Sequence, residues 1–82
     1  MLHSKSFKVQ VVDEDREAVI GVRVDLMRAS RTQEFVKPQY TDFNGLARFR
    51  GENIGEVYLF LNAVNYGILR YEAGRSVTVS YL

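Results

Sequence analysis

The 82-residue sequence lacks cysteine and tryptophan, and it has one histidine and one proline. Without cysteine the chain cannot form a disulfide framework, use thiol chemistry or build a cysteine-ligated zinc site. The single imidazole, His3, lies within residues 1–5, which we expect to be flexible. No apolar run approaches the ~20 residues that span a bilayer, and the N-terminus carries no secretory signal, so we expect no membrane span.

The sequence also has almost no excess of one sign of charge, since 11 Lys and Arg against 10 Asp and Glu leave a net charge of +1. Such a balance gives no general attraction to nucleic acid or to an anionic membrane. At this length we expect a single domain over residues 1–82, and folding should hide only ~60% of the surface of the unfolded chain. The core must therefore be small.

Alternation of apolar and polar side chains is the main pattern that is present. Phe7, Val9 and Val11 alternate with Lys8 and Gln10, and the same period recurs at residues 22–26 and 76–81. With the turn signals between them, these runs predict seven short strands and no helix, arranged as an all-β sandwich. We expect the later strands at residues 33–41, 46–50, 56–64, 68–72 and 75–82, with a turn at residues 65–67.

The clearest turn signal is Asp42-Phe43-Asn44-Gly45. The Asp42 carboxylate can accept a hydrogen bond from the backbone two residues later, and Gly45 can adopt a positive φ without a Cβ clash. This predicts a hairpin with a type I turn and a bulge. Asp42 and Asn44 also suggest a calcium loop, but the further spaced acids and the terminal Glu of such a loop are missing.

Three sequence blocks follow one another along the chain: residues 20–26 (IGVRVDL), 41–49 (TDFNGLARF) and 55–66 (GEVYLFLNAVNY). In this order they resemble the carboxypeptidase regulatory-like domains, which belong with the transthyretin-like and collagen-adhesin B-type sandwiches. Val19 stands where the family often has Pro, and Asn65 where it usually has Gly. The resemblance covers residues 7–82 and implies a seven-strand Greek-key β-sandwich of immunoglobulin-like or prealbumin-like type. It also implies that Val57, Leu59, Leu61 and Ala63 point inward with Ala47 and Phe49.

We expect no catalytic, cofactor or metal site, and therefore no enzyme. Nucleophilic catalysis needs a base beside a Ser, Thr or Cys, and His3 is the single candidate imidazole. The acidic run at residues 13–17 is typical of a solvated loop rather than of a cation site. Gly45, Gly51 and Gly55 lie at turns and open no helix, so they form no phosphate-binding loop.

Tyr58 and Phe60 do not fit the pattern of a sheet that has one buried face and one face exposed to water. If Val57, Leu59 and Leu61 fill the core, these two rings point outward side by side. Either the loop at residues 29–39 covers them, or they pack across strands with Tyr71 or Tyr40 on the same outer face. Alternatively, Tyr58, Phe60 and Tyr71 form an interface for another chain or a platform for a sugar.

Two further surfaces follow from the strand pattern. Arg48 and Arg50 should share one outer face as a candidate basic surface, which Arg23, Arg28 and Arg70 could join, although nearby acids dilute its charge. The last strand, at residues 77–82, has no Lys or Pro to protect it as an edge, so it could accept another strand.

These observations predict a non-catalytic structural or protein-binding module, either self-associating or an accessory domain of a longer chain. A small β nucleic-acid-binding protein and a carbohydrate-binding accessory module remain as alternatives, because sandwiches of this kind have many functions. The resemblance further implies an extracellular or cell-surface location.

Overall fold

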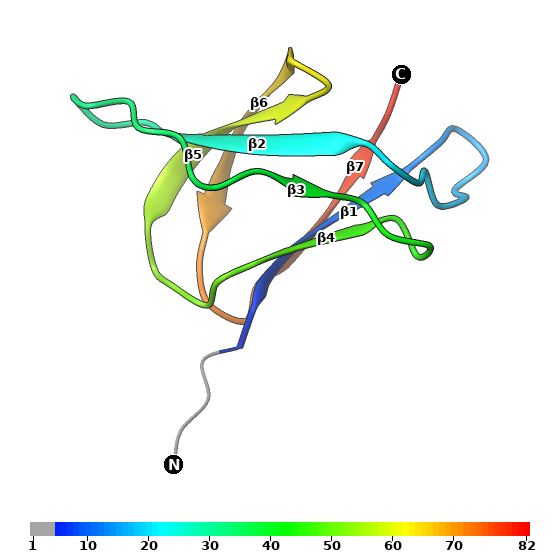
Figure 1. The fold of residues 1–82 in the computed structure, drawn as a ribbon, viewed down its shortest axis with the longest axis horizontal. Coiled ribbons are helices and arrows are strands. Elements are labelled where there is room, and N and C mark those ends of the chain that lie inside the picture. The colour runs from blue at the N-terminus through cyan, green and yellow to red at the C-terminus, as the bar shows by residue number, and fades with distance from the viewer. Residues whose placement is uncertain (1–4) are drawn as a thin grey trace.

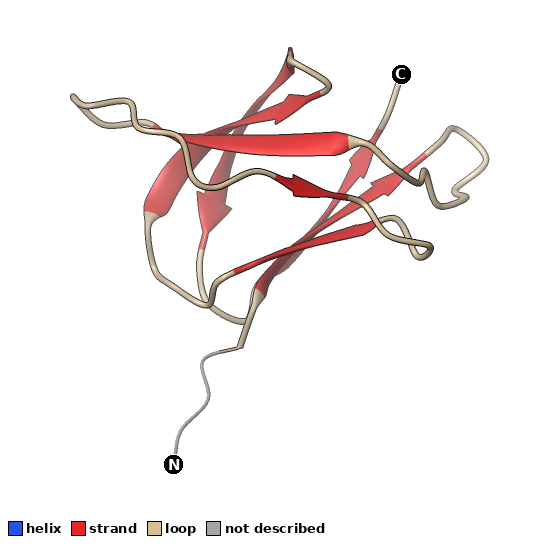
Figure 2. Ribbon diagram, in the orientation of Figure 1, coloured by secondary structure: helices blue, strands red, loops and turns tan. Residues whose placement is uncertain are grey.

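The structure, a computed structural model, describes residues 5–82 (Figure 1). The strands are β1 (Phe7–Val12), β2 (Arg23–Arg28), β3 (Gln39–Tyr40), β4 (Leu46–Phe49), β5 (Gly55–Leu61), β6 (Val64–Tyr71) and β7 (Ser76–Ser80). The described residues contain strands, turns and loops (Figure 2), and none of them forms a helix able to cross a membrane. His3 and the expected flexible end up to residue 4 lie outside the described residues.

Two sheets pack face to face, which confirms the predicted all-β sandwich. One sheet has three strands in the order β4-β1-β7, and the other has four in the order β3-β2-β5-β6. All neighbouring strands are antiparallel except β1 and β7, which run parallel with Lys8 opposite Ser76 and Val12 opposite Ser80. The chain changes sheet between β1 and β2, between β3 and β4, between β4 and β5, and between β6 and β7 (Figure 1).

The core lies between the sheets and consists of the residues that alternate inward along each strand. The fully buried or nearly buried side chains are Phe7, Val9, Val11, Val22, Val24, Leu26, Ala47, Phe49, Val57, Leu59, Leu61 and Tyr71. The inward positions expected from the alternation and from the family resemblance are therefore correct, with one exception. Ala63 is exposed because it lies in the turn after β5. Burial of these aliphatic and aromatic side chains supplies most of the stability of such a domain.

The turn at Asp42–Gly45 joins the two sheets instead of closing a hairpin. Its local geometry is as predicted, because Gly45 has φ +73° and its N–H donates to the Asp42 carbonyl at 2.9 Å. However, β3 pairs with β2 and β4 pairs with β1, so the strands on either side of the turn belong to different sheets. The strand expected at residues 33–41 is also shorter, since only Gln39–Tyr40 and a single bridge between Met27 and Phe35 pair with β2.

The β5–β6 hairpin turns three residues earlier than predicted, at Asn62 and Ala63. Both residues have positive φ (48° and 70°), as a two-residue hairpin loop of type I′ requires. Asn62 holds this turn against β2, because its Oδ1 accepts the N–H of Arg23 at 3.0 Å while its own N–H donates to the Arg23 carbonyl at 2.9 Å. The sequence Asn65-Tyr66-Gly67, predicted as the turn, lies inside β6 at a register irregularity opposite Leu59 and Phe60.

Candidate functional site

The outer face of the four-stranded sheet carries several large apolar side chains among charged ones. Residues directly opposite one another on paired strands point to the same face, so the register places Met27 beside Tyr58, and Tyr58 beside Ile68. The apolar side chains gathered on this surface, which we call the aromatic face, are Met27, Phe35, Tyr40, Tyr58, Phe60 and Ile68. An exposed apolar surface of this kind is unusual for one side of a sandwich in water.

The segment between β2 and β3 covers part of this face. It runs along β2, where the N–H of Val36 donates to the Leu26 carbonyl at 2.8 Å and the N–H of Arg28 donates to the Glu34 carbonyl at 2.8 Å. Phe35 packs against Phe60 with ring centroids 5.9 Å apart and planes tilted by 50°. Phe35 nevertheless remains 59% exposed, so the loop shields one edge of Phe60 and leaves the face open.

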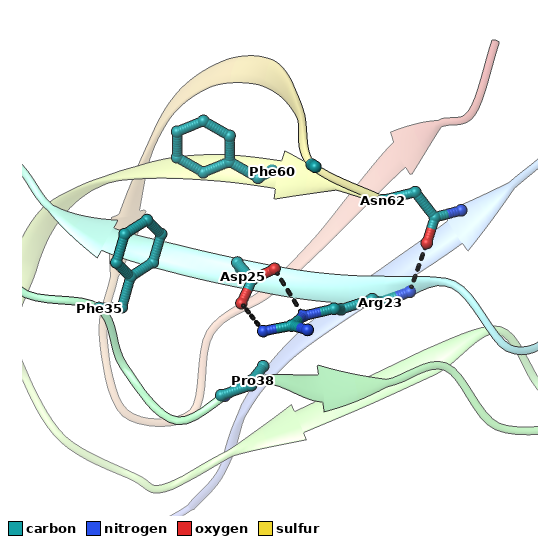
Figure 3. A pocket seen from close by; sticks show the side chains of 7 residues that line it. Arg23, Asp25, Phe35, Pro38, Phe60 and Asn62 are labelled. Atoms are coloured by element: carbon teal, nitrogen blue, oxygen red, sulfur yellow. Dashed lines mark hydrogen bonds and ion pairs between the residues drawn. The ribbon is translucent and has the colours of Figure 1, made fainter.

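A hollow of about 550 Å³ opens between this segment and the sheet (Figure 3). Phe35 and Phe60 flank one end, and the side chains of Arg23 and Asp25 lie at the other, beside Pro38 (Figure 3). The residues that line it are Arg23, Asp25, Phe35, Pro38, Phe60, Asn62 and Ala63. The volume is large enough for one bulky side chain or one sugar ring.

Arg23 and Asp25 form an ion pair within the hollow. The Arg23 Nε donates to Asp25 Oδ2 at 3.0 Å, and its Nη2 lies 3.4 Å from Oδ1 (Figure 3). The hydrogen bond and the charge of Asp25 raise the pKa of the Arg23 guanidinium above its usual value. The side chain of Asp25 is only 13% exposed, whereas that of Arg23 is 50% exposed. The hollow therefore presents donors and acceptors with no net charge.

The outer face of the three-stranded sheet is polar by comparison. Lys8 lies between Arg48 and Ser76, and Gln10 lies between Leu46 and Thr78. Arg48 and Arg50 are exposed as predicted. The wider basic surface does not form, because Arg23, Arg28 and Arg70 belong to the other sheet, and Arg48 itself pairs with Asp42 at 3.5 Å.

Tyr71 is not part of the aromatic face, which corrects the prediction. Its pairing with Gly55 places it on the inner side of β6, where it is completely buried. Its ring stacks on Phe7 with centroids 4.5 Å apart, and its hydroxyl donates to the Arg50 carbonyl at 2.6 Å. Burial raises the pKa of the Tyr71 phenol above its usual value.

Asp42 and Asn44 organise the turn between the sheets. The Asp42 Oδ1 accepts the N–H groups of Leu46 at 3.0 Å and of Asn44 at 2.9 Å. These two hydrogen bonds, with a smaller attraction from Arg48, hold the pKa of Asp42 below its usual value of 3.8. Among residues 5–82, no three acidic or imidazole side chains come close enough to hold a metal ion.

The low pKa of Asp42 predicts a specific loss of stability in acid. Because the pKa is lower in the folded than in the unfolded chain, the ionised carboxylate stabilises the fold above the unfolded value, and this contribution disappears as the pH falls below about 4. We expect the melting temperature of the wild type to fall more steeply in that range than that of Asp42→Asn, whose amide oxygen still accepts both hydrogen bonds. Parallel melting curves from pH 6 downward would measure this, and identical slopes would contradict it.

The sequence identified Tyr58 and Phe60 on the aromatic face, but Phe60 is the only one of its candidate interface residues that lines the hollow. Phe35 was recognised only as part of a covering loop, and Arg23 only as a basic residue. Asp25 and Pro38 have no distinctive sequence signal. The alternation at residues 22–26 already placed Arg23 and Asp25 on one outer face, so their ion pair was the one element that the pattern could have revealed.

Comparison with solved structures supports the fold. The Bacillus anthracis TIE protein superposes with a TM-score of 0.65 and 14% sequence identity, over 96% of this chain and 16% of that protein's chain. The chain thus spans about a sixth of that larger protein. No protein-family model matches the sequence, and no curated protein matches it. At this identity the similarity is one of fold.

Proposed function

We propose that the domain is a non-catalytic protein-binding module whose binding surface is the aromatic face. The observation that carries this proposal is the difference between the two outer faces of the sandwich. One bears six large apolar side chains, two of which line an open hollow, together with the charged residues Arg23, Asp25, Glu56 and Arg70. The other bears mainly charged, amide and hydroxyl groups. Exposed aromatic residues with an adjacent Arg are the usual anchors of protein interfaces.

The residues that line the hollow indicate which chemical groups a partner would place there. Its walls of Phe35, Phe60 and Pro38 suit one large apolar side chain, and the Arg23–Asp25 pair can exchange hydrogen bonds with the backbone beside that side chain. Since the pair carries no net charge, a strongly charged partner gains little there. The best occupant is a partner protein that presents a Trp, Phe or Leu flanked by uncharged polar groups.

We further propose that the fold is a Greek-key sandwich of the carboxypeptidase regulatory-like type. Three features support this assignment: the position of the IGVRVDL block in and before β2, the TDFNGLARF block across the turn into β4, and the GEVYLFL block as β5. Four changes of sheet along seven strands fit such a topology.

Binding of small probes to the hollow tests the proposed function. N-acetyl-tryptophanamide and N-acetyl-leucinamide imitate a partner's anchor side chain, and NMR titration measures where they bind. We expect shifts in the amides of Asp25, Phe35 and Phe60. Phe60→Ser should weaken binding by about tenfold or more, since a truncated aromatic anchor typically costs over ~1.4 kcal/mol.

Arg48→Ser is the matched control, because it changes one exposed side chain on the polar outer face. Its binding should equal that of the wild type. Shifts that cluster on β1, β4 and β7, or binding that survives Phe35→Ser plus Phe60→Ser in a folded protein, would exclude the aromatic face as the binding surface.

A carbohydrate-binding module is the second candidate, favoured by the arrangement of Arg23 and Asp25 next to two rings. A sugar can stack its C–H face on an aromatic ring while adjacent hydroxyls reach a planar donor and acceptor pair. Methyl glucopyranoside in the same titration separates the two candidates. Sugar-induced shifts at Asp25 and Phe60 without a response to the amino-acid amides would favour the carbohydrate function.

A further inference from the structure

Strand β7 has a free edge. It is the outermost strand of the three-stranded sheet, and within residues 5–82 its single strand partner is β1 (Figure 1). Val77 and Val79 point toward the core but remain only half-buried, because no further strand covers their outer flank. The strand Ser76–Ser80 contains no charged residue and no proline. It therefore lacks the side chains that usually protect an edge from pairing.

The hydrogen bonds to β1 show which backbone groups of β7 are free. The N–H of Lys8 donates to the Arg75 carbonyl at 3.0 Å, and the N–H of Tyr81 donates to the Val12 carbonyl at 2.8 Å. In a parallel ladder the residues that bond to the neighbour alternate along the strand. Residues 75, 77, 79 and 81 therefore face β1, and the N–H and C=O groups of Ser76, Thr78 and Ser80 point to the open edge.

The sequence of β7, Ser-Val-Thr-Val-Ser, is the same in both directions. If two copies pair antiparallel about Thr78, Ser76 meets Ser80 of the second copy, Val77 meets Val79, and Thr78 meets its own counterpart. All three outward-facing residues then form hydrogen-bonded pairs, which gives about six inter-chain hydrogen bonds. Hydroxyl pairs lie on one face and valine pairs on the other, and no like charges oppose each other.

We propose that β7 is a self-association edge, at which two copies of the chain pair antiparallel about Thr78. The two three-stranded sheets become one six-stranded sheet in the order β4-β1-β7-β7-β1-β4. The valines of both copies then cover each other's exposed flanks beneath the new strand pair. One short strand pair falls below the ~1,200 Å² of a standard interface, so the dimer is weak and depends on concentration. This surface is separate from the aromatic face.

Light scattering from micromolar to millimolar concentration tests the proposal. The wild-type mass should rise from 9.4 kDa toward twice that value. Thr78→Pro should stay monomeric with a melting temperature near that of the wild type, because the Thr78 N–H has no partner among residues 5–82. Thr78→Lys should also stay monomeric, since it opposes two charges across the two-fold axis. Thr78→Ala retains the backbone bonds and should dimerise.

Amide hydrogen exchange of the wild type supplies a readout that needs no variant. Dimerisation should slow exchange at Ser76, Thr78 and Ser80, while Val77 and Val79, already bonded to β1, should change little. A monomer at all concentrations would overturn the proposal. So would a dimer that survives Thr78→Lys but is lost in Phe60→Ser, because that result would place self-contact on the aromatic face.

Discussion

Replacement of Gly45 by alanine should lower the free energy of unfolding by about 3 kcal/mol or more. Gly45 has φ +73°, a conformation that costs a residue with a side chain roughly 1–3 kcal/mol. In addition, an alanine Cβ at this position would lie 2.5 Å from the Val11 carbonyl oxygen and 3.1 Å from the Cβ of Ala18. Relief of this clash requires the turn to move away from β1, which breaks the 2.7 Å hydrogen bond from the Val11 N–H to the Gly45 carbonyl.

Gly21→Ala is the matched control for this prediction. Gly21 has nearly the same backbone conformation, φ +78°, but a Cβ there would meet nothing within 4 Å. Its substitution should therefore cost only the conformational part, roughly 1–3 kcal/mol, and less than Gly45→Ala costs. Urea unfolding of the three proteins measures both effects, and equal losses for the two substitutions would show that the contact with Val11 is unimportant.

Replacement of Tyr71 by alanine should cost about 3–5 kcal/mol, the range measured for large aromatic residues in cores. The ring stacks on Phe7 and meets Phe49 edge-on with centroids 6.2 Å apart, so its removal leaves a cavity between the two sheets. A domain of this size has roughly 4–12 kcal/mol of total stability at ~0.05–0.15 kcal/mol per residue. The variant should therefore lose a large share of the stability of the domain and melt at a much lower temperature than the wild type.

Tyr71→Phe separates packing from hydrogen bonding at the same site. It retains the ring and removes only the hydroxyl that donates to the Arg50 carbonyl, so the loss should be about 1 kcal/mol. Circular dichroism melts of the two variants provide the comparison. A phenylalanine variant as unstable as the alanine variant would mean that the hydroxyl, rather than ring packing, secures this part of the core.

Whether the sequence alone could predict the buried face of a strand depended on how regularly its apolar and polar residues alternate. In β1 and β2 most apolar residues occupy alternate positions, so the inward face could be assigned without knowledge of the neighbours. Strand β5 is apolar on both faces, and its inward residues were assigned from the family resemblance. In β6 the run Ile68-Leu69-Arg70-Tyr71 has apolar residues on both faces. Only the pairing register then decides which face is buried, and a shift by one residue reverses it.

That register depends on a turn that the sequence did not reveal. The hairpin turns at Asn62-Ala63, where alanine occupies a positive-φ position that usually selects glycine or asparagine. Contacts distant in sequence hold the turn in place: those of Asn62 with Arg23 and the hydrogen bond from Asn62 Nδ2 to the Tyr81 hydroxyl at 2.9 Å. The prediction followed the stronger local signal, Asn65 to Gly67, and so began the following strand at residue 68 instead of Val64.

The sequence likewise predicted only part of the candidate site. Tyr58 and Phe60 were identified because the family resemblance assigned the other large residues of this strand to the core, which left these two rings on its outer side. The hollow, in contrast, is formed where an irregular segment folds over β2, and the position of Phe35 there depends on backbone hydrogen bonds to Leu26 and Arg28. Such contacts follow no period, so no pattern in the sequence could predict them.

The parallel pairing of β1 with β7 also determines how the domain responds to tension along the chain. A force that pulls residue 7 and residue 80 apart acts along both strands in opposite directions, because the two strands run the same way side by side. All the hydrogen bonds between them are then loaded in shear together, instead of opening one after another from an end. We therefore expect the β1–β7 pair to resist such a pull more strongly than a strand pair whose hydrogen bonds open one at a time.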